Sequence, residues 1–237
     1  MYARRGWIGA QIPQGEASVI SLLLFLMFAG MLFVLLNLML LPLHFTVQSL
    51  VSLMTIPAEL YRIATNPRLR RNHALEHATI NVIEEHYGPV GLAGLAREDG
   101  FLIRGPADPA LIEEAARVGL ARLAAGESRL AIHQRCGTSV AAAHLLSAVV
   151  FLFLLLLGGW LSLFTVIMAV LVAGMVGPVA GVVMQRYLTT STDVGGLTIL
   201  GVEYERPVFN PLELLFGGPV RPTLFFVRVG EQTFWRR

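Results

Sequence analysis

The sequence has no lysine and a single cysteine among its 237 residues. Its 18 basic side chains are therefore all arginines, and many of them lie in short groups beside apolar runs. Nucleic-acid binding needs a clustered basic face, so the composition does not indicate a nucleic-acid partner. The lone Cys136 cannot form an intramolecular disulfide, which leaves a core residue, a metal ligand or a reactive thiol as its roles.

Charged residues are also scarce, at 14% against 55% hydrophobic residues. This balance is typical of integral membrane proteins. The first long apolar run, 18–41, can cross about 30 Å of hydrocarbon as a helix. No small-residue cleavage site follows it, so we expect a retained membrane segment and not a cleaved signal peptide. Pro42 is expected to break this helix.

A second apolar stretch, 44–56, carries a polar stripe formed by His44, Gln48, Ser52 and Thr55. Such an amphipathic segment either lies in the membrane interface or crosses the bilayer with its stripe towards other helices. The positive-inside rule favours crossing, because the arginines near residues 4, 62–71 and 186 then share the cytoplasmic side. One span or two spans before residue 60 both stay open.

A transmembrane helical hairpin is predicted further along the chain. Runs 139–157 and 161–184 are apolar, and Gly158-Gly159 links them without a charge. Ala173, Gly177 and Gly181 recur at every fourth residue and predict a small-residue face for close helix packing.

Only the stretch 66–138 can form a soluble core, and its pattern indicates alternating helices and strands. Residues 68–85 are predicted to form a helix whose apolar side is Ala74, Leu75, Ala78 and Val82. Asp99-Gly100 predicts a two-residue hairpin turn. Asp108-Pro109 is expected to begin a second helix, to Ala125. Residues 130–133 then read as a third strand, and 197–202 and 223–229 in the tail are β-rich.

The predicted fold class is an α-helical membrane protein with three to four transmembrane helices. A small cytoplasmic α+β domain is inserted between these helices, and a short β-rich tail follows them. The expected boundaries are an N-terminal tail 1–17, membrane segments 18–60, the α+β domain 66–138, the transmembrane hairpin 139–186 and the tail 187–237. We expect a bacterial inner membrane protein with the α+β domain in the cytoplasm.

The run His73-Ala74-Leu75-Glu76-His77 is the main functional signal. Read as H-x-x-E-H, it is the reversed form of the zinc-protease helix motif. Two imidazoles four residues apart lie one turn apart on one helix face and can chelate one metal ion. Glu76 lies beside that face and is the candidate general base towards a metal-bound water.

A zinc site needs a third protein ligand, and His133 and Cys136 are the preferred candidates because they lie where the soluble domain enters the next membrane helix. Glu84 is too far along the helix to share the ion with His77 and is better placed to orient an imidazole. The remaining candidates are Glu113 and Glu114, which fit a solvated helix face, and His44 and His144, which lie within apolar runs.

Several short motifs together resemble an uncharacterised bacterial membrane family, a domain of unknown function. They are the run from Arg71 to Thr79, Gly100-Phe101, Arg122-Leu123 with Gly126-Glu127, and Cys136-Gly137-Thr138. The resemblance extends from about Asn66 to the next membrane run and implies no established activity. Inverzincin peptidases are similar only in the five-residue motif, and their usual third ligand, a downstream glutamate, has no marked counterpart here.

Two functions follow as hypotheses. In the first, the chain is a membrane-anchored zinc metallohydrolase acting on a protein or peptide: His73 and His77 bind the metal, His133 or Cys136 completes the site, and Glu76 activates water. In the second, it is a non-enzymatic scaffold or assembly factor whose histidines bind a metal or a tetrapyrrole, or only form hydrogen bonds. The lipid bilayer is the expected partner in both, and the oligomeric state stays open.

Overall fold

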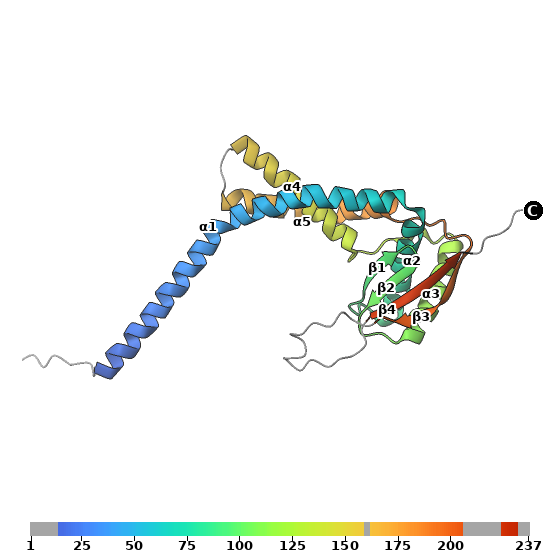
Figure 1. Ribbon diagram of the computed structural model, residues 1–237, viewed down its shortest axis with the longest axis horizontal. Coiled ribbons are helices and arrows are strands. Elements are labelled where there is room, and N and C mark those ends of the chain that lie inside the picture. Colours follow the sequence, from blue (N-terminus) through green and yellow to red (C-terminus); the bar gives the residue numbers. More distant parts are fainter. Residues whose placement is uncertain (1–13, 159–161, 206–223, 232–237) are drawn as a thin grey trace, which may run out of the picture.

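The computed structural model describes residues 14–158, 162–205 and 224–231. Within them the chain is mostly helical and has a small antiparallel sheet. Three helices are long and apolar enough to cross a membrane. They extend from one side of a smaller layered domain that contains the sheet (Figure 1).

Helix α1 (Gln14–Thr65) joins the first two apolar runs into one helix. The prediction that Pro42 breaks the helix is wrong, because Pro42 lies inside α1. A proline has no N–H for the carbonyl four residues before it, and long apolar helices tolerate this loss with a kink. Figure 1 shows α1 changing direction about midway without reversing, so the two runs form one candidate span.

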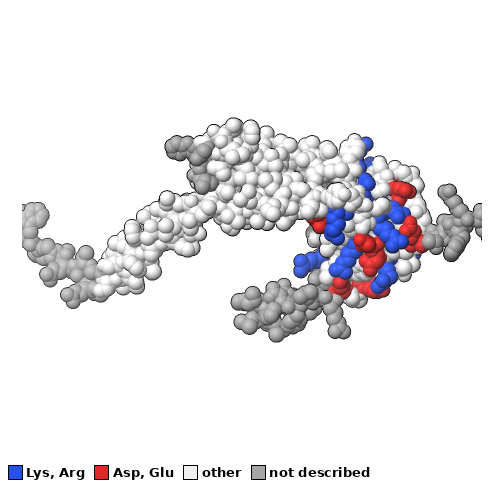
Figure 2. Space-filling model, turned by 45° about the horizontal axis from the view of Figure 1, so that its top comes forward, with Lys and Arg blue, Asp and Glu red and all other residues white. Residues whose placement is uncertain are grey.

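Helices α4 (Gly137–Gly158) and α5 (Leu163–Met184) form the predicted hairpin, and the C-terminal half of α1 packs on them. The small-residue face of α5 is buried against α4, as predicted. At Gly181, a β-carbon would lie only 2.5 Å from the Ser139 hydroxyl oxygen, so the close approach of the two helices requires glycine there. The face of these helices visible in Figure 2 is almost free of charged atoms, which gather over the layered domain.

The layered domain consists of two helices packed on one sheet. Helices α2 (Pro67–Tyr87) and α3 (Pro109–Ala124) contact each other and the strands. The strands are β1 (Ala93–Arg97), β2 (Gly100–Arg104), β3 (Leu197–Tyr204) and β4 (Leu224–Glu231), in the order β1-β2-β4-β3. Both tail strands therefore belong to the same sheet as the central hairpin.

Local capping signals explain where the two domain helices begin. The side chain of Asn66 accepts a hydrogen bond from the Leu69 N–H at 3.1 Å, and Pro67 occupies the first turn of α2. Asp108 caps α3 in the same way through the Ala110 N–H at 2.8 Å. The predicted apolar side of α2 lies in the core against α3 and the sheet. Its polar side is also covered, and every residue of 72–80 is buried.

Two local predictions need correction. The hairpin is present, but Arg97 pairs with Gly100, so its two turn residues are Glu98 and Asp99. The third strand predicted at 130–133 is wrong, since Ser128–Ala131 forms a 3₁₀ turn. The carbonyls that such a strand would use are bonded to α2 side chains instead: Asn81 donates to those of Leu130 and Ile132, each at 3.0 Å.

Candidate metal centre

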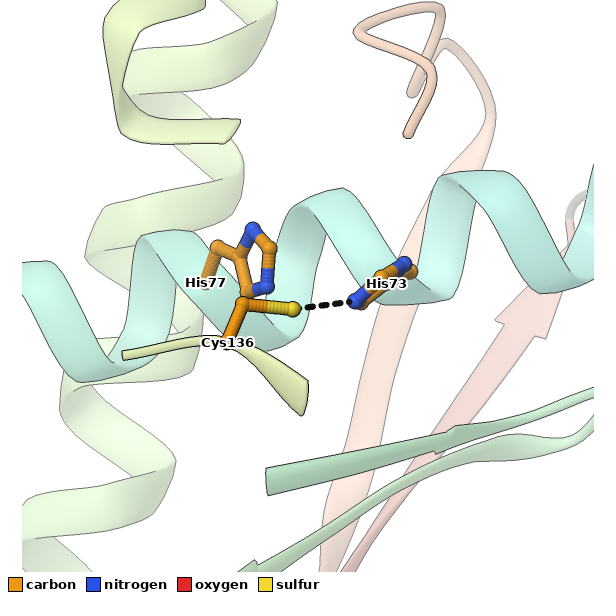
Figure 3. Close-up of side chains that lie close together, drawn as sticks. All are labelled: His73, His77 and Cys136. Atoms are coloured by element: carbon orange, nitrogen blue, oxygen red, sulfur yellow. Dashed lines mark hydrogen bonds between the residues drawn. The ribbon is translucent and has the colours of Figure 1, made fainter. Parts of the chain in front are cut away.

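Helix α2 presents two buried imidazoles on the side that faces away from its apolar core. The side chains of His73 and His77 are one turn apart, and their ring centroids are 4.4 Å apart. The two residues are 7% and 0% exposed. Figure 3 shows both rings on the side of α2 where the segment containing Cys136 passes.

A backbone carbonyl fixes the orientation of each imidazole. His73 Nδ1 donates to the Thr189 carbonyl at 2.9 Å, and His77 Nδ1 donates to the Ala131 carbonyl at 2.7 Å. In the neutral rings the proton therefore sits on Nδ1, and the Nε2 lone pair is available as a ligand. Among the described residues, the buried Nε2 of His77 has no hydrogen-bond partner. Metal-binding histidines are usually oriented in this way.

Cys136 brings a sulfur to the same point from the segment that precedes α4. Its Sγ lies 3.3 Å from His73 Nε2, to which the thiol donates, and the Thr138 N–H donates back to the sulfur at 3.3 Å. The ligand atoms of His73, His77 and Cys136 all lie within 4.8 Å of one another. These three buried residues could hold a metal ion.

Glu76 lies between the two histidines in the sequence, and its carboxyl group points towards β1. The Ala96 N–H donates to this carboxyl group, whereas Oε2 is buried without a partner among the described residues. A β-carbon on Gly94 would overlap the carboxyl group of Glu76, so this carboxyl group would have to move if Gly94 were replaced by a larger residue. Burial raises the pKa of Glu76 to about 8.

Burial also favours the neutral forms of the three candidate ligands. It lowers the pKa of His73, although the hydrogen bond to Thr189 opposes this. It lowers the pKa of His77 well below its usual value, and the nearby His73 contributes. Burial raises the pKa of the Cys136 thiol. A bound divalent cation would oppose these effects at the thiol and at Glu76, because it stabilises their charged forms.

The raised pKa of Glu76 predicts how the stability of the metal-free chain depends on pH. Between about 4.5, where the unfolded carboxyl group titrates, and about 8, the folded state keeps a proton that the unfolded state releases. The contribution of Glu76 to the free energy of unfolding is therefore largest below about pH 4.5 and decreases by several kcal/mol as the pH rises to about 8.

Glu76→Gln cannot ionise and keeps the other titrating groups, so it isolates this contribution. We expect the wild-type chain to become progressively less stable than Glu76→Gln as pH rises through this window. Unfolding of both proteins in mild detergent with a chelator, measured at several pH values, checks this. A difference in stability that does not vary with pH would contradict it.

A cavity of about 420 Å³ gives access to one side of the centre. His73, Glu76 and Cys136 line it, together with the exposed edge of β1 and the end of α1. His77 is not among the lining residues. The candidate ligands thus lie at one wall of a cavity between the apolar helices and the layered domain.

The other sequence candidates do not belong to this group of three candidate ligands. His133 lies near it, with its ring centroid 6.0 Å from that of His77, but its Nε2 donates to Glu84 at 3.3 Å. Glu84 thus orients the imidazole of His133, which is not one of the three grouped candidate ligands. Glu113 pairs with Arg117 on a partly exposed face of α3. His44 and His144 are exposed on α1 and α4.

Two residues that hold His73 and the segment beside the centre in place were not identified from the sequence. They belong to a π-helical turn, Gln185–Thr189, that follows α5. Thr189 supplies the carbonyl for His73, and the fully buried Gln185 bonds both the N–H and the carbonyl of His133, at 2.8 and 3.0 Å. The only sequence signal is a glutamine placed directly after an apolar run.

Comparisons with known proteins agree with the resemblance noted from the motifs. The family described as "Domain of unknown function (DUF6391)" matches residues 68–202. An uncharacterized protein of Picosynechococcus sp. (strain ATCC 27264 / PCC 7002 / PR-6) is 33% identical over 143 residues, an alignment that covers 52% of this chain and 66% of that protein. No solved structure matches the chain significantly.

Proposed function

The chain belongs to the DUF6391 family, and we propose that it is a membrane-anchored zinc hydrolase. The observation that carries the proposal is the buried group of His73, His77 and Cys136, with donor atoms within 4.8 Å of one another. The buried carboxyl group of Glu76 lines the same cavity as two of these ligands.

The donor set favours zinc. Thiolate and imidazole ligands suit this ion, and hydrolytic zinc sites use three protein ligands and leave the fourth position to water. The carbonyls of Thr189 and Ala131 supply the second-layer hydrogen bonds that hold such imidazoles in place.

A bound zinc ion would lower the pKa of a water molecule towards neutrality. In the proposed reaction, the water oxygen bonds to the acyl carbon of the substrate, and the bond from this carbon to the leaving atom breaks. Glu76 accepts a proton from the water and passes it to the leaving atom. The Ala96 N–H holds the carboxyl group in place for this transfer.

We also propose that the three apolar helices cross a bacterial inner membrane and that the layered domain lies in the cytoplasm. The apolar helices and the arginines near their domain ends support this, since Arg62 lies in the last turn of α1 and Arg186 follows α5. Arg4 and Arg5, used in the topology argument, lie outside the described residues.

Elemental analysis of the full chain, purified without a histidine tag in mild detergent, tests the metal centre. We expect about one zinc ion per chain. His73→Ala/His77→Ala should lose it, because both imidazole ligands are gone. The matched control His44→Ala/His144→Ala removes two exposed histidines and should keep it.

The unfolding temperature of each variant shows whether metal loss reflects the ligands or a failure to fold. A folded wild-type chain without metal would overturn the proposal. A bound zinc ion with no metal-dependent hydrolysis of an activated ester would favour the second candidate, a non-enzymatic scaffold. The existing hydrogen bond between Cys136 and His73 is compatible with that candidate.

A further inference from the structure

The cavity beside the candidate metal centre has one unusual wall, the outer edge of β1. In the sheet of the described residues, β1 pairs only with β2, so its other edge has no strand neighbour. Gly94, Leu95 and Ala96 of this strand line the cavity. An unpaired edge offers backbone donors and acceptors that can pair with another chain.

The hairpin register shows which backbone groups face this edge. Arg97 and Gly100 close a two-residue turn and form a hydrogen-bonded pair. Alternate pairs in an antiparallel ladder direct their N–H and C=O groups outward, so those of Gly94 and Ala96 point away from β2. The hydrogen bond from the Ala96 N–H to Glu76 agrees with this assignment. The backbone groups of Gly94 and the Ala96 carbonyl have no partner among the described residues.

The remaining walls are mainly apolar. Ile56, Leu60 and Ile63 of α1 and Leu69 of α2 line them. Glu59 and Arg62 also line the cavity, and the Arg62 guanidinium donates hydrogen bonds to the Glu59 carboxylate at 2.6 and 3.0 Å. A lipid phosphate would need a free cation, and a lipid acyl chain would leave the β1 backbone groups unpaired. An extended polypeptide can pack apolar side chains against these walls and form backbone hydrogen bonds with the open edge of β1.

We propose that the cavity binds an extended apolar polypeptide segment as an additional strand on the free edge of β1, at Gly94. Binding through main-chain hydrogen bonds, with pockets for alternate side chains, is an established mode of peptide recognition. Cleavage of the bound segment rests on the proposed function, whereas binding does not. Cleavage would consume one water, break one peptide C–N bond and form a carboxyl group and an amine.

The test uses the full chain in lipid nanodiscs with a chelator present, so that binding is measured without hydrolysis. The probe is a fluorescein-labelled peptide of alternating leucine and alanine, followed by fluorescence anisotropy. Two further peptides carry N-methyl groups on one or the other set of alternate residues. Only one set of N–H groups in an extended strand faces β1, so one methylated peptide should bind about tenfold more weakly or worse, and the other like the parent.

A pair of variants checks that the peptide occupies this cavity. Ala141→Trp fills the cavity from α4, where Ala141 is a lining residue. Val140→Trp adds the same bulk at the exposed neighbouring position. We expect only Ala141→Trp to lose at least about tenfold in peptide affinity while unfolding at the same temperature as Val140→Trp.

Three results would overturn the proposal: no binding of the parent peptide, equal binding of all three peptides, or displacement of the peptide by phosphatidylglycerol. The first two would exclude strand pairing, and the third would identify a lipid site. The zinc content and the ester hydrolysis, which test the proposed function, are measured independently of these results. A failure of peptide binding can therefore be distinguished from a failure of the proposed function.

Discussion

Glu76→Gln is expected to slow zinc-dependent hydrolysis of p-nitrophenyl acetate by about 10²–10⁴-fold while the zinc content stays at the wild-type level. Glutamine has the shape of the protonated carboxyl group and still offers an oxygen to the Ala96 N–H. It cannot accept a proton from water. Because the metal ligands are unchanged, the decrease in rate reports the loss of proton transfer.

The matched control is Glu85→Gln, the same substitution on the same helix. Glu85 is exposed and pairs with Arg122, away from the cavity lining. It should hydrolyse the ester at the wild-type rate. An activated ester reports on the activated water whatever the natural substrate is. If Glu76→Gln keeps the full rate with zinc bound, Glu76 is not the base.

Loss of activity through unfolding can be separated from this result. The wild-type carboxyl group is buried with a raised pKa, so its removal should stabilise the metal-free fold at neutral and higher pH. A variant that is more stable and less active has kept its fold and has lost a group that takes part in the reaction. This combination is typical of a polar group kept at an active site at a cost in stability.

The parts of the site that were predictable from the sequence depend on short-range geometry. The spacing of His73 and His77 fixes their relation once α2 forms, and Asn66-Pro67 marks where this helix begins. The hairpin of β1 and β2 and the close packing of α4 on α5 are likewise determined by turn residues and by glycine spacing.

The parts that were not predictable depend on contacts distant in sequence. The periodicity of α2 shows a polar face, but not that the 3₁₀ turn and the residues after α5 bury it. The insertion of β4 between β2 and β3 needs pairing across more than 100 residues. At Pro42 the local helix-breaking rule failed, because α1 continues through the proline.

Contacts between residues distant in sequence also distinguish Cys136 from His133, which the sequence left as equal candidates for the third ligand. Both lie in the short segment between the 3₁₀ turn and α4. Gln185 bonds the His133 backbone, and the ring donates to Glu84. Cys136, three residues further on, has its sulfur 3.3 Å from His73 Nε2. The path of this segment, and not the residue types, therefore brings the Cys136 sulfur together with the ligand atoms of His73 and His77.

Cys136→Ser is therefore expected to weaken zinc binding by more than the roughly 10–100-fold that is typical of changes outside the ligand shell, whereas His133→Ala should stay within or below that range. The serine hydroxyl can keep the hydrogen bond from the Thr138 N–H, so the fold is preserved, but it is a poor substitute for a thiolate. Competition with a chromophoric chelator gives the zinc affinity of each stripped protein.

Cobalt substitution identifies the ligand directly, because a thiolate bound to Co²⁺ gives a sulfur-to-metal charge-transfer absorption. The band should be present in the wild-type chain and in His133→Ala, and absent from Cys136→Ser. If Cys136→Ser kept the zinc affinity and His133→Ala lost it, the sulfur would be a packed thiol and the third ligand would be His133. The site would then have to rearrange around Glu84, because this carboxylate accepts the hydrogen bond from His133 Nε2.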